Sequence, residues 1–174
     1  FGPFYETVPL TVAPDDGRPL ILIRALNDVL KTSFLNAFKF CLYGTAKQPI
    51  GLGKGEGLHK VLVNRRAALE DGGETSVSLS LDDDGERYVI TRSVKFKKVD
   101  TWGDPPELSK WRVIITDGSG TAIVDPQNNI KKESDYDAYI EKWIPRDMQQ
   151  FFLFDGQAIQ TYAEKEPSPD IYNA

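Results

Sequence analysis

The sequence has very little cysteine and histidine. Its 174 residues include one cysteine, Cys41, and one histidine, His59. A single cysteine excludes an internal disulfide and agrees with a reducing cytoplasm, where we expect the protein to be. Because Cys41 lies within a helical pattern of apolar residues, we interpret it as a small core residue rather than a reactive thiol. His59 lies beside a glycine-rich stretch, and we interpret it as a surface residue.

The sequence also lacks an excess of positive charge and any long apolar segment. It has 21 Lys and Arg against 26 Asp and Glu, a net charge of −5. Overall charge therefore does not favour nucleic-acid binding, and any contact with DNA must use a local patch. No apolar run approaches the ~20 residues that a membrane span needs. The first residues, Phe-Gly-Pro-Phe, do not resemble a signal peptide, so we expect no membrane partner.

Apolar periodicity predicts strands and helices in the first part of the chain. Residues 6–12 alternate as in a strand, and residues 20–23 form a continuous apolar run, as in a strand buried on both faces. From Lys31 the pattern becomes helical and ends at Gly44. The predicted buried face of this helix consists of Phe34, Leu35, Phe38, Cys41 and Leu42. A short helix is predicted within residues 58–71.

The middle of the chain is predicted to be β-structure. Residues 75–81 and 87–94 alternate around Asp84-Gly85, a hairpin signal. Residues 111–116 and 121–124 form a second hairpin around the sequence DGSG. A helix is predicted from Ser134, as its N-cap, to Ile144, before Pro145. An apolar strand at 149–154 and another helix at 155–165 complete the pattern.

A phosphate-binding motif is present without its glycines. The P-loop pattern is G-x-x-x-x-G-K-[ST] between a strand and a helix. Residues 25–32 read A-L-N-D-V-L-K-T, so Ala25 and Leu30 replace both glycines. Lys31 is the residue expected to reach β- and γ-phosphates, and Thr32 is the residue expected to bind Mg²⁺. The helix N-terminus that follows favours an anion.

The departures from the motif have physical consequences. Glycine allows positive φ and a close approach of the backbone to the anion. Leu30 would place a side chain beside the phosphates, and a non-glycine residue at positive φ costs on the order of 1–3 kcal/mol. Asp28 adds negative charge near an anion site, whereas Asn27 suits a tight loop. On this stretch alone, a P-loop and an ordinary strand–loop–helix with a chance Lys-Thr-Ser remain equal alternatives.

Several stretches, in order along the chain, resemble the N-terminal half of an SMC-like ATPase head. They are FGPF, LILIRALNDVLKTSFLNAFKFCLYG, GERYVITRSV and FFLFDGQAIQ. The sequence is most similar to the DndD-like proteins of DNA modification and defence, which are relatives of the SMC-like ATPase of double-strand-break repair. The resemblance covers residues 1–164, and we expect residues 165–174 to lead toward a coiled coil.

The resemblance implies a fold, ligands and site residues. The expected fold is α/β, a P-loop NTPase of the ABC or SMC head type, in which this N-terminal lobe carries an antiparallel β-meander. The implied ligands are ATP and Mg²⁺. Asp155 lies where the Q-loop ligand of Mg²⁺ is expected, although it also fits a helix N-cap after a strand. The implied nucleotide-binding residues are Asn27, Asp28, Val29, Leu30, Lys31, Thr32 and Ser33, with Thr32 and Asp155 as metal ligands.

The implied function is ATP binding and hydrolysis coupled to DNA repair, DNA modification or anti-phage defence. The implied partners are the C-terminal lobe of the same head, a second head in a homodimer, DNA, and other defence or repair subunits. Because the loop is altered, we expect weak or absent nucleotide binding. We expect no turnover by this part alone, because half of the catalytic groups come from elsewhere. Two alternatives are a nucleotide-blind structural lobe of a DNA-associated complex and a small-molecule kinase. The two hairpins and the lack of a lid-like arginine cluster count against a kinase.

Overall fold

The structure is a computed structural model that describes residues 4–6, 9, 28–44, 63–102, 107–148 and 153, without the side chains of 28–32, 71 and 148. The helices are α1 (Asp28–Tyr43), α3 (Arg65–Asp71) and α4 (Glu133–Trp143). The strands are β1 (Glu74–Asp83), β2 (Glu86–Phe96), β3 (Leu108–Asp117) and β4 (Ala122–Val124). Two short 3₁₀ turns, η1 (Pro126–Asn128) and η2 (Arg146–Met148), flank α4 in the chain.

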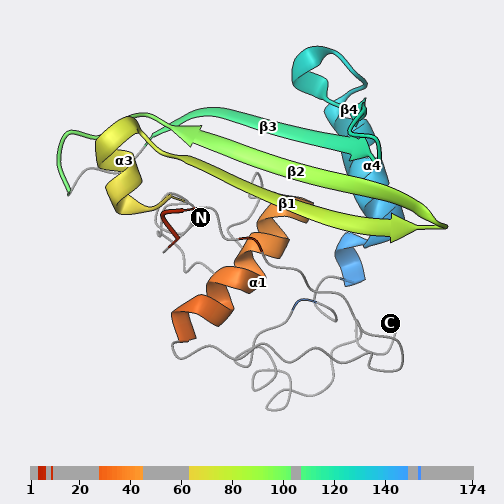
Figure 1. Cartoon of the computed structure of the whole chain (residues 1–174), viewed down its shortest axis with the longest axis horizontal. Coiled ribbons are helices and arrows are strands. Elements are labelled where there is room, and N and C mark those ends of the chain that lie inside the picture. Colours follow the sequence, from red (N-terminus) through yellow and green to blue (C-terminus); the bar gives the residue numbers. More distant parts are fainter. Residues whose placement is uncertain are drawn as a thin grey trace.

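The four strands form one antiparallel sheet in the order β1-β2-β3-β4, and Figure 1 shows β1 to β3 as its long strands. The alternation in residues 75–81 and 87–94 is therefore confirmed as a hairpin, with Leu81 opposite Tyr88 in register. Asp84 and Gly85 connect the strands at φ 52° and 82°, the backbone of a two-residue turn that matches the strand twist. The second predicted hairpin is also confirmed, as β3 and β4.

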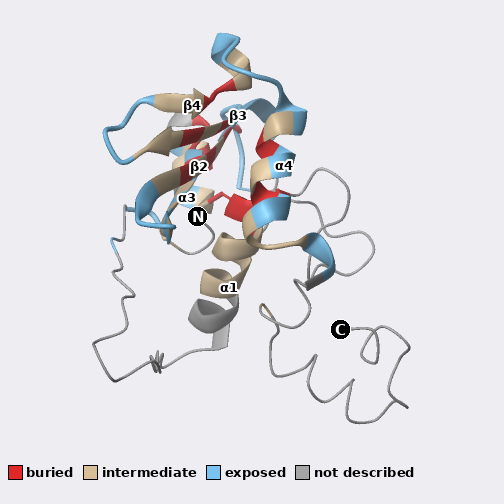
Figure 2. Cartoon of the chain, turned by 90° about the vertical axis from the view of Figure 1, so that its right-hand side faces the viewer, coloured by how far each residue is buried: buried red, intermediate tan, exposed pale blue. Residues whose placement is uncertain are grey.

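The sheet has an inner face that packs against the helices and an outer face that no described helix covers. Helix α1 contacts β1 and β2, whereas α4 contacts β3 and β4, and both lie on the same side of the sheet (Figures 1 and 2). Buried Ile90, Val113 and Ile115 point to this inner face. The outer positions of the three long strands carry short hydroxyl, charged and branched side chains. They are Glu74, Ser76, Ser78, Ser80, Asp82, Arg87, Val89, Thr91, Ser93, Lys95, Lys110, Arg112, Ile114 and Thr116.

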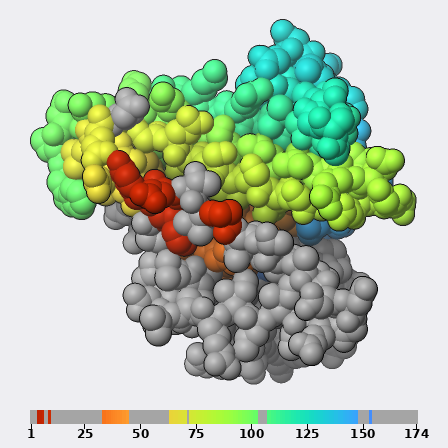
Figure 3. Space-filling model, in the orientation of Figure 1, coloured from red at the N-terminus to blue at the C-terminus, as the bar shows by residue number. Residues whose placement is uncertain are grey.

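The core consists of two apolar clusters. The larger joins the C-terminal end of α1 to the middle of the sheet and to α4, where Tyr136 and Ile140 are buried. The smaller lies under α3 and includes Phe40, Val94 and Phe96. Phe4–Glu6 lie beside α3, as Figure 3 shows, because the Tyr5 hydroxyl donates a hydrogen bond to Glu70 and Arg66 lies 4.6 Å over the Tyr5 ring.

The predicted helices after α1 are present, with one correction at a cap. Helix α3 begins after Asn64, whose side-chain oxygen accepts a hydrogen bond from the Arg66 N–H at 3.0 Å. The prediction that Ser134 caps α4 was wrong: Ser134 lies inside the helix, and the cap is Lys132. The Asp135 carboxylate accepts the Lys132 backbone N–H at 2.7 Å. An acidic residue three positions after the cap thus accepts a hydrogen bond from the backbone N–H of the cap residue, as in a capping box.

Helix α1 also differs from its prediction. It begins at Asp28, three residues before the predicted start at Lys31. Its buried part is not the predicted stripe along one face, because residues 33–39, including Phe34, Leu35 and Phe38, are all half-buried. Burial is instead complete at the last turn, where Phe40, Cys41, Leu42 and Tyr43 are at most 5% exposed. The core-residue prediction for Cys41 is confirmed.

The structure tests the antiparallel lobe more fully than the strand–helix core. The predicted strands at 6–12, 20–23 and 149–154 and the helix at 155–165 lie outside the described residues, apart from Glu6, Pro9 and Leu153 taken singly. Leu153 packs against the larger core cluster. Together with the sheet, the described helices give a mixed α/β fold. No helix in the described part of the chain is long and apolar enough to cross a membrane.

Candidate nucleotide-binding site

The predicted phosphate-binding residues lie at the N-terminal end of α1. Asp28, Val29 and Leu30 form its first turn, and Lys31, Thr32 and Ser33 follow directly. Ser33 is half-buried. Asn27 and Asp155 lie outside the described residues, so their roles, and the predicted proximity of Asp155 to Lys31, stay predictions.

The early start of α1 changes how the altered motif is understood. Leu30 is α-helical and is not among the described residues at positive φ. The strain expected for a leucine in a glycine position is therefore absent. The strain is avoided because Asp28–Leu30, the three residues before Lys31, already form the first turn of α1. Leucine favours this conformation, since it is among the better helix formers, whereas glycine in a helix costs roughly 0.8–1 kcal/mol relative to alanine.

The helical conformation of residues 28–30 affects anion binding. The first backbone N–H groups of a helix have no partner within it and are available to an anion. Here those groups belong to Asp28, Val29 and Leu30, whereas the N–H of Thr32 points to the carbonyl of Asp28. Asp28 belongs to this first turn, and the negative charge of an acidic residue at a helix N-terminus opposes the binding of phosphates there. This first turn therefore fits Mg²⁺–ATP less well than a glycine loop followed by a helix beginning at Lys31.

The opposite end of α1 is held by a buried polar cluster on three elements. The Cys41 carbonyl accepts hydrogen bonds from Arg92 Nε on β2 at 3.2 Å and from the Tyr136 hydroxyl on α4 at 2.6 Å. The Arg92 guanidinium carbon lies 4.9 Å from the Tyr136 ring centroid. A cation at a helix C-terminus is stabilised by the helix dipole. Arg92 and Tyr136 thus fix the last turn of α1 to the sheet and to α4.

Gly44 ends the helix and leaves space for the arginine. Its φ is 64°, and its N–H donates to the Phe40 carbonyl at 3.0 Å, the geometry of a helix C-terminus in which glycine is preferred. A Cβ on Gly44 would lie 2.5 Å from Arg92 Nη1. The glycine is therefore required both by its backbone conformation and by the close approach of Arg92.

Burial perturbs the titration of the side chains around this helix end. Desolvation raises the pKa of the Cys41 thiol to about 12, so the thiol stays protonated and unreactive at neutral pH. Burial also raises the pKa of Tyr43 to about 12, helped by the nearby negative charge of Glu141. The pKa of Tyr136 is raised by the same desolvation. These groups act as neutral hydrogen-bond and packing partners.

Sequence reasoning missed Arg92 and Tyr136. A signal for Arg92 was present. Residues two apart in a strand point to the same face, so Arg92 points to the inner face together with Ile90 and Val94. The structure shows it 9% exposed. Tyr136 gave no comparable signal, because its partner Cys41 is 95 residues away in the chain.

Comparison with protein-family models matches residues 1–170 to the AAA domain. The chain belongs to the AAA domain family. This match covers the strand–loop–helix motif, the meander and Asp155, and it supports a P-loop ATPase of the AAA and SMC-like kind with a nucleotide-binding function. The family generally uses ATP and Mg²⁺. None of the curated proteins matches the chain.

Proposed function

We propose that the chain is the ATP-binding half of an SMC-like ATPase head, of the DndD-like kind, coupled to DNA repair, DNA modification or defence against foreign DNA. The observation that carries this proposal is the order of elements around α1. A helix that carries Lys31-Thr32-Ser33 in its first two turns is followed by an antiparallel meander. The family match provides the ATPase class, and the DndD-like group and the link to DNA come from the sequence resemblance.

In this proposal, the residues of the chain position a nucleotide that other parts complete. Lys31 would contact the phosphates as a cation, and Thr32 and Asp155 would provide oxygen ligands for Mg²⁺. The remaining catalytic groups come from the C-terminal lobe of the head and from a second head, which together enclose ATP in a homodimer. Hydrolysis then allows the two heads to separate.

The proposal is tested on the full-length protein. ATP–Mg²⁺ titration is followed by calorimetry, and the mass of the particle is measured by light scattering with and without nucleotide. We expect weak binding and a shift toward a dimer at high nucleotide concentration. Lys31→Ala should remove both effects, whereas Lys39→Ala, a change of the same type two turns further along α1, should preserve them. Equal behaviour of the two variants would contradict the assignment of Lys31.

A second candidate function is a nucleotide-blind lobe that serves only assembly of a DNA-associated complex. The helical conformation of Asp28–Leu30 favours it, because these residues do not form the anion-binding loop of an active ATPase. The same experiment distinguishes the two functions. Absence of nucleotide binding in the unaltered protein and after restoration of glycine at positions 25 and 30 would favour the nucleotide-blind lobe.

A further inference from the structure

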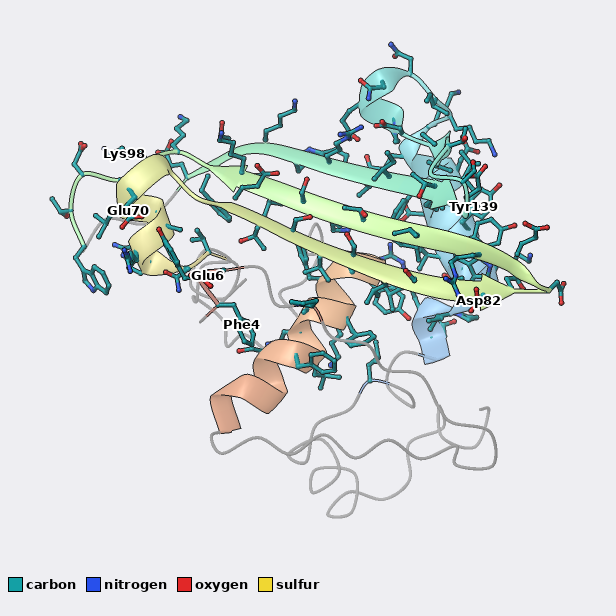
Figure 4. All side chains as sticks on the ribbon, in the orientation of Figure 1. Phe4, Glu6, Glu70, Asp82, Lys98 and Tyr139 are labelled. Atoms are coloured by element: carbon teal, nitrogen blue, oxygen red, sulfur yellow. The ribbon has the colours of Figure 1, made fainter. Side chains whose placement is uncertain are left out.

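Three exposed lysines lie near α3, and two of them are on the outer face of the sheet. Lys95 on β2 and Lys110 on β3 are directly opposite each other in register, and both are exposed. Like charges at such positions destabilise a sheet. Lys98 follows β2 beside α3, as Figure 4 shows. We name Lys95, Lys98 and Lys110 the lysine group.

The acidic residues in the described part of the chain do not neutralise this group. The carboxylate of Glu107 is 2.8 Å from Lys97 Nζ, and that of Asp125 forms the ion pair with Arg112. Glu74 is opposite Lys95 in register, yet no ion pair among the described residues joins them. The lysine group therefore forms no ion pair with a carboxylate of the described residues, although the chain has a net charge of −5.

The rest of the outer face suits a flat, polyanionic partner. Ser76, Ser78 and Ser80 follow one another on β1, and Thr91 and Ser93 lie opposite on β2. Hydroxyl groups and lysines are the usual donors to phosphate oxygens in protein–DNA contacts. Short side chains also allow a sugar–phosphate backbone to approach the sheet closely. No described helix covers this face.

We propose that this outer face binds the phosphate backbone of duplex DNA through the lysine group. The inference rests on the proposed function, which requires contact with DNA but does not locate it. Single-stranded nucleic acid fits less well, because its binding uses aromatic stacking platforms and the outer positions of β1 to β3 carry no aromatic side chain. Binding is independent of sequence, since backbone contacts carry no base information.

The test uses full-length protein and a fluorescently labelled duplex of random sequence, with affinity measured by anisotropy over a series of salt concentrations. For Lys95→Gln/Lys110→Gln we expect affinity to fall about tenfold at low salt. The slope of log K against log salt should decrease by about 2, because each lost phosphate contact contributes about 0.9. The melting temperature should stay equal or rise, because a pair of like charges is removed.

The matched control is Arg87→Gln/Lys132→Gln, which removes the same charge elsewhere. Arg87 is on the same face but pairs with Asp82, which Figure 4 labels at the opposite end of the sheet. We expect the control to change affinity less than twofold, or about 0.4 kcal/mol. Equal losses in the two double variants would overturn the proposal. So would a single-stranded competitor that displaces the duplex better than unlabelled duplex does.

ATP titration of the same variants separates this inference from the proposed function. Loss of DNA affinity with unchanged ATP binding supports the lysine group as a distinct surface. If DNA affinity depends on the lysines but no nucleotide binds even after glycine restoration, the ATPase proposal fails and this inference stands. If the double variant keeps its DNA affinity but loses a protein partner from its complex, the face is a protein interface and the inference is wrong.

Discussion

The two ends of α1 differ in what they provide: the C-terminal end is anchored in the core, and the N-terminal end carries the phosphate motif. At the C-terminal end, residues 40–43 are buried, and Cys41 accepts hydrogen bonds from two other elements. At the N-terminal end, Asp28–Leu30 extend the helix through the last part of the phosphate motif. Contacts in the described part of the chain thus anchor the helix at the end far from the proposed chemistry. We therefore expect changes in the motif to alter ligand binding more than they alter the fold.

The largest expected effect comes from comparing two phenylalanines of α1. Phe40 is 3% exposed, so Phe40→Ala should lower the free energy of unfolding by about 3–5 kcal/mol. Phe38 is half-buried and makes an edge contact with Phe34 at 4.9 Å. Its replacement by alanine should cost about 1–2 kcal/mol, less than a fully packed site. Urea denaturation of both variants checks the difference, and equal losses would show that α1 is held along its whole length.

The next largest effect is expected at Gly44. Alanine there meets two penalties: about 1–2 kcal/mol for the left-handed backbone and roughly 1–3 kcal/mol for displacing Arg92 from its close approach. Gly120 has a φ of 86° with no atom within 4 Å of an added Cβ, so Gly120→Ala isolates the first penalty. Thermal and urea unfolding should show Gly44→Ala as the less stable variant. Similar stabilities of the two variants would show that the close approach of Arg92 does not constrain residue 44.

The smallest effect concerns the contact between the β1–β2 hairpin and α4. Asp83 accepts hydrogen bonds from Lys142 Nζ at 2.8 Å and Trp143 Nε1 at 2.9 Å, and these bonds hold the pKa of its carboxyl below the ordinary value. A lowered folded-state pKa stabilises the protein above the ordinary aspartate pKa of about 3.9, and this stability is lost as pH falls through the lowered pKa. Asp83→Asn should therefore destabilise modestly at neutral pH and have no effect in acid.

Urea unfolding followed by circular dichroism across the pH range measures this dependence. The control is Glu86→Gln, which removes a nearby exposed carboxylate that has no ion pair among the described residues. A constant difference between wild type and Asp83→Asn at all pH values would show that packing, rather than charge, accounts for the contact.

The meander was predictable from the sequence because its signals are local. Alternation in residues 75–81 and the Asp84-Gly85 turn specify strand faces and register without reference to the rest of the chain. The cap of α4 was less predictable, because Ser134 with Asp137 and Lys132 with Asp135 have the same spacing. A backbone N–H can serve as the donor at either position, so the side chain at the cap does not decide between them.

The residues of the candidate site stay a prediction from the sequence motif, whereas the backbone conformation of Asp28–Leu30 could not be predicted. Lys31 and Thr32 identify the motif directly, whereas the helical state of Leu30 depends on how the preceding chain enters the helix. The anchoring of the C-terminal end depends on Arg92 and Tyr136, which lie 51 and 95 residues from Cys41. Contacts between residues so far apart leave no periodic signal, so tertiary structure is needed to find them.

The central claim is that the motif is a P-loop by descent whose altered loop binds nucleotide weakly. Calorimetry with ATP–Mg²⁺ on the intact protein tests it most directly. The account predicts weak or absent binding by the unaltered chain. It also predicts at least about tenfold tighter binding, near 1.4 kcal/mol, after Ala25→Gly and Leu30→Gly, because glycine weakens the first helical turn and opens the loop. Lys31→Ala in that background should remove the gain. Tight binding by the unaltered chain would contradict the claim that the altered loop weakens nucleotide binding. Absence of binding after glycine restoration would contradict the claim that the motif is a P-loop.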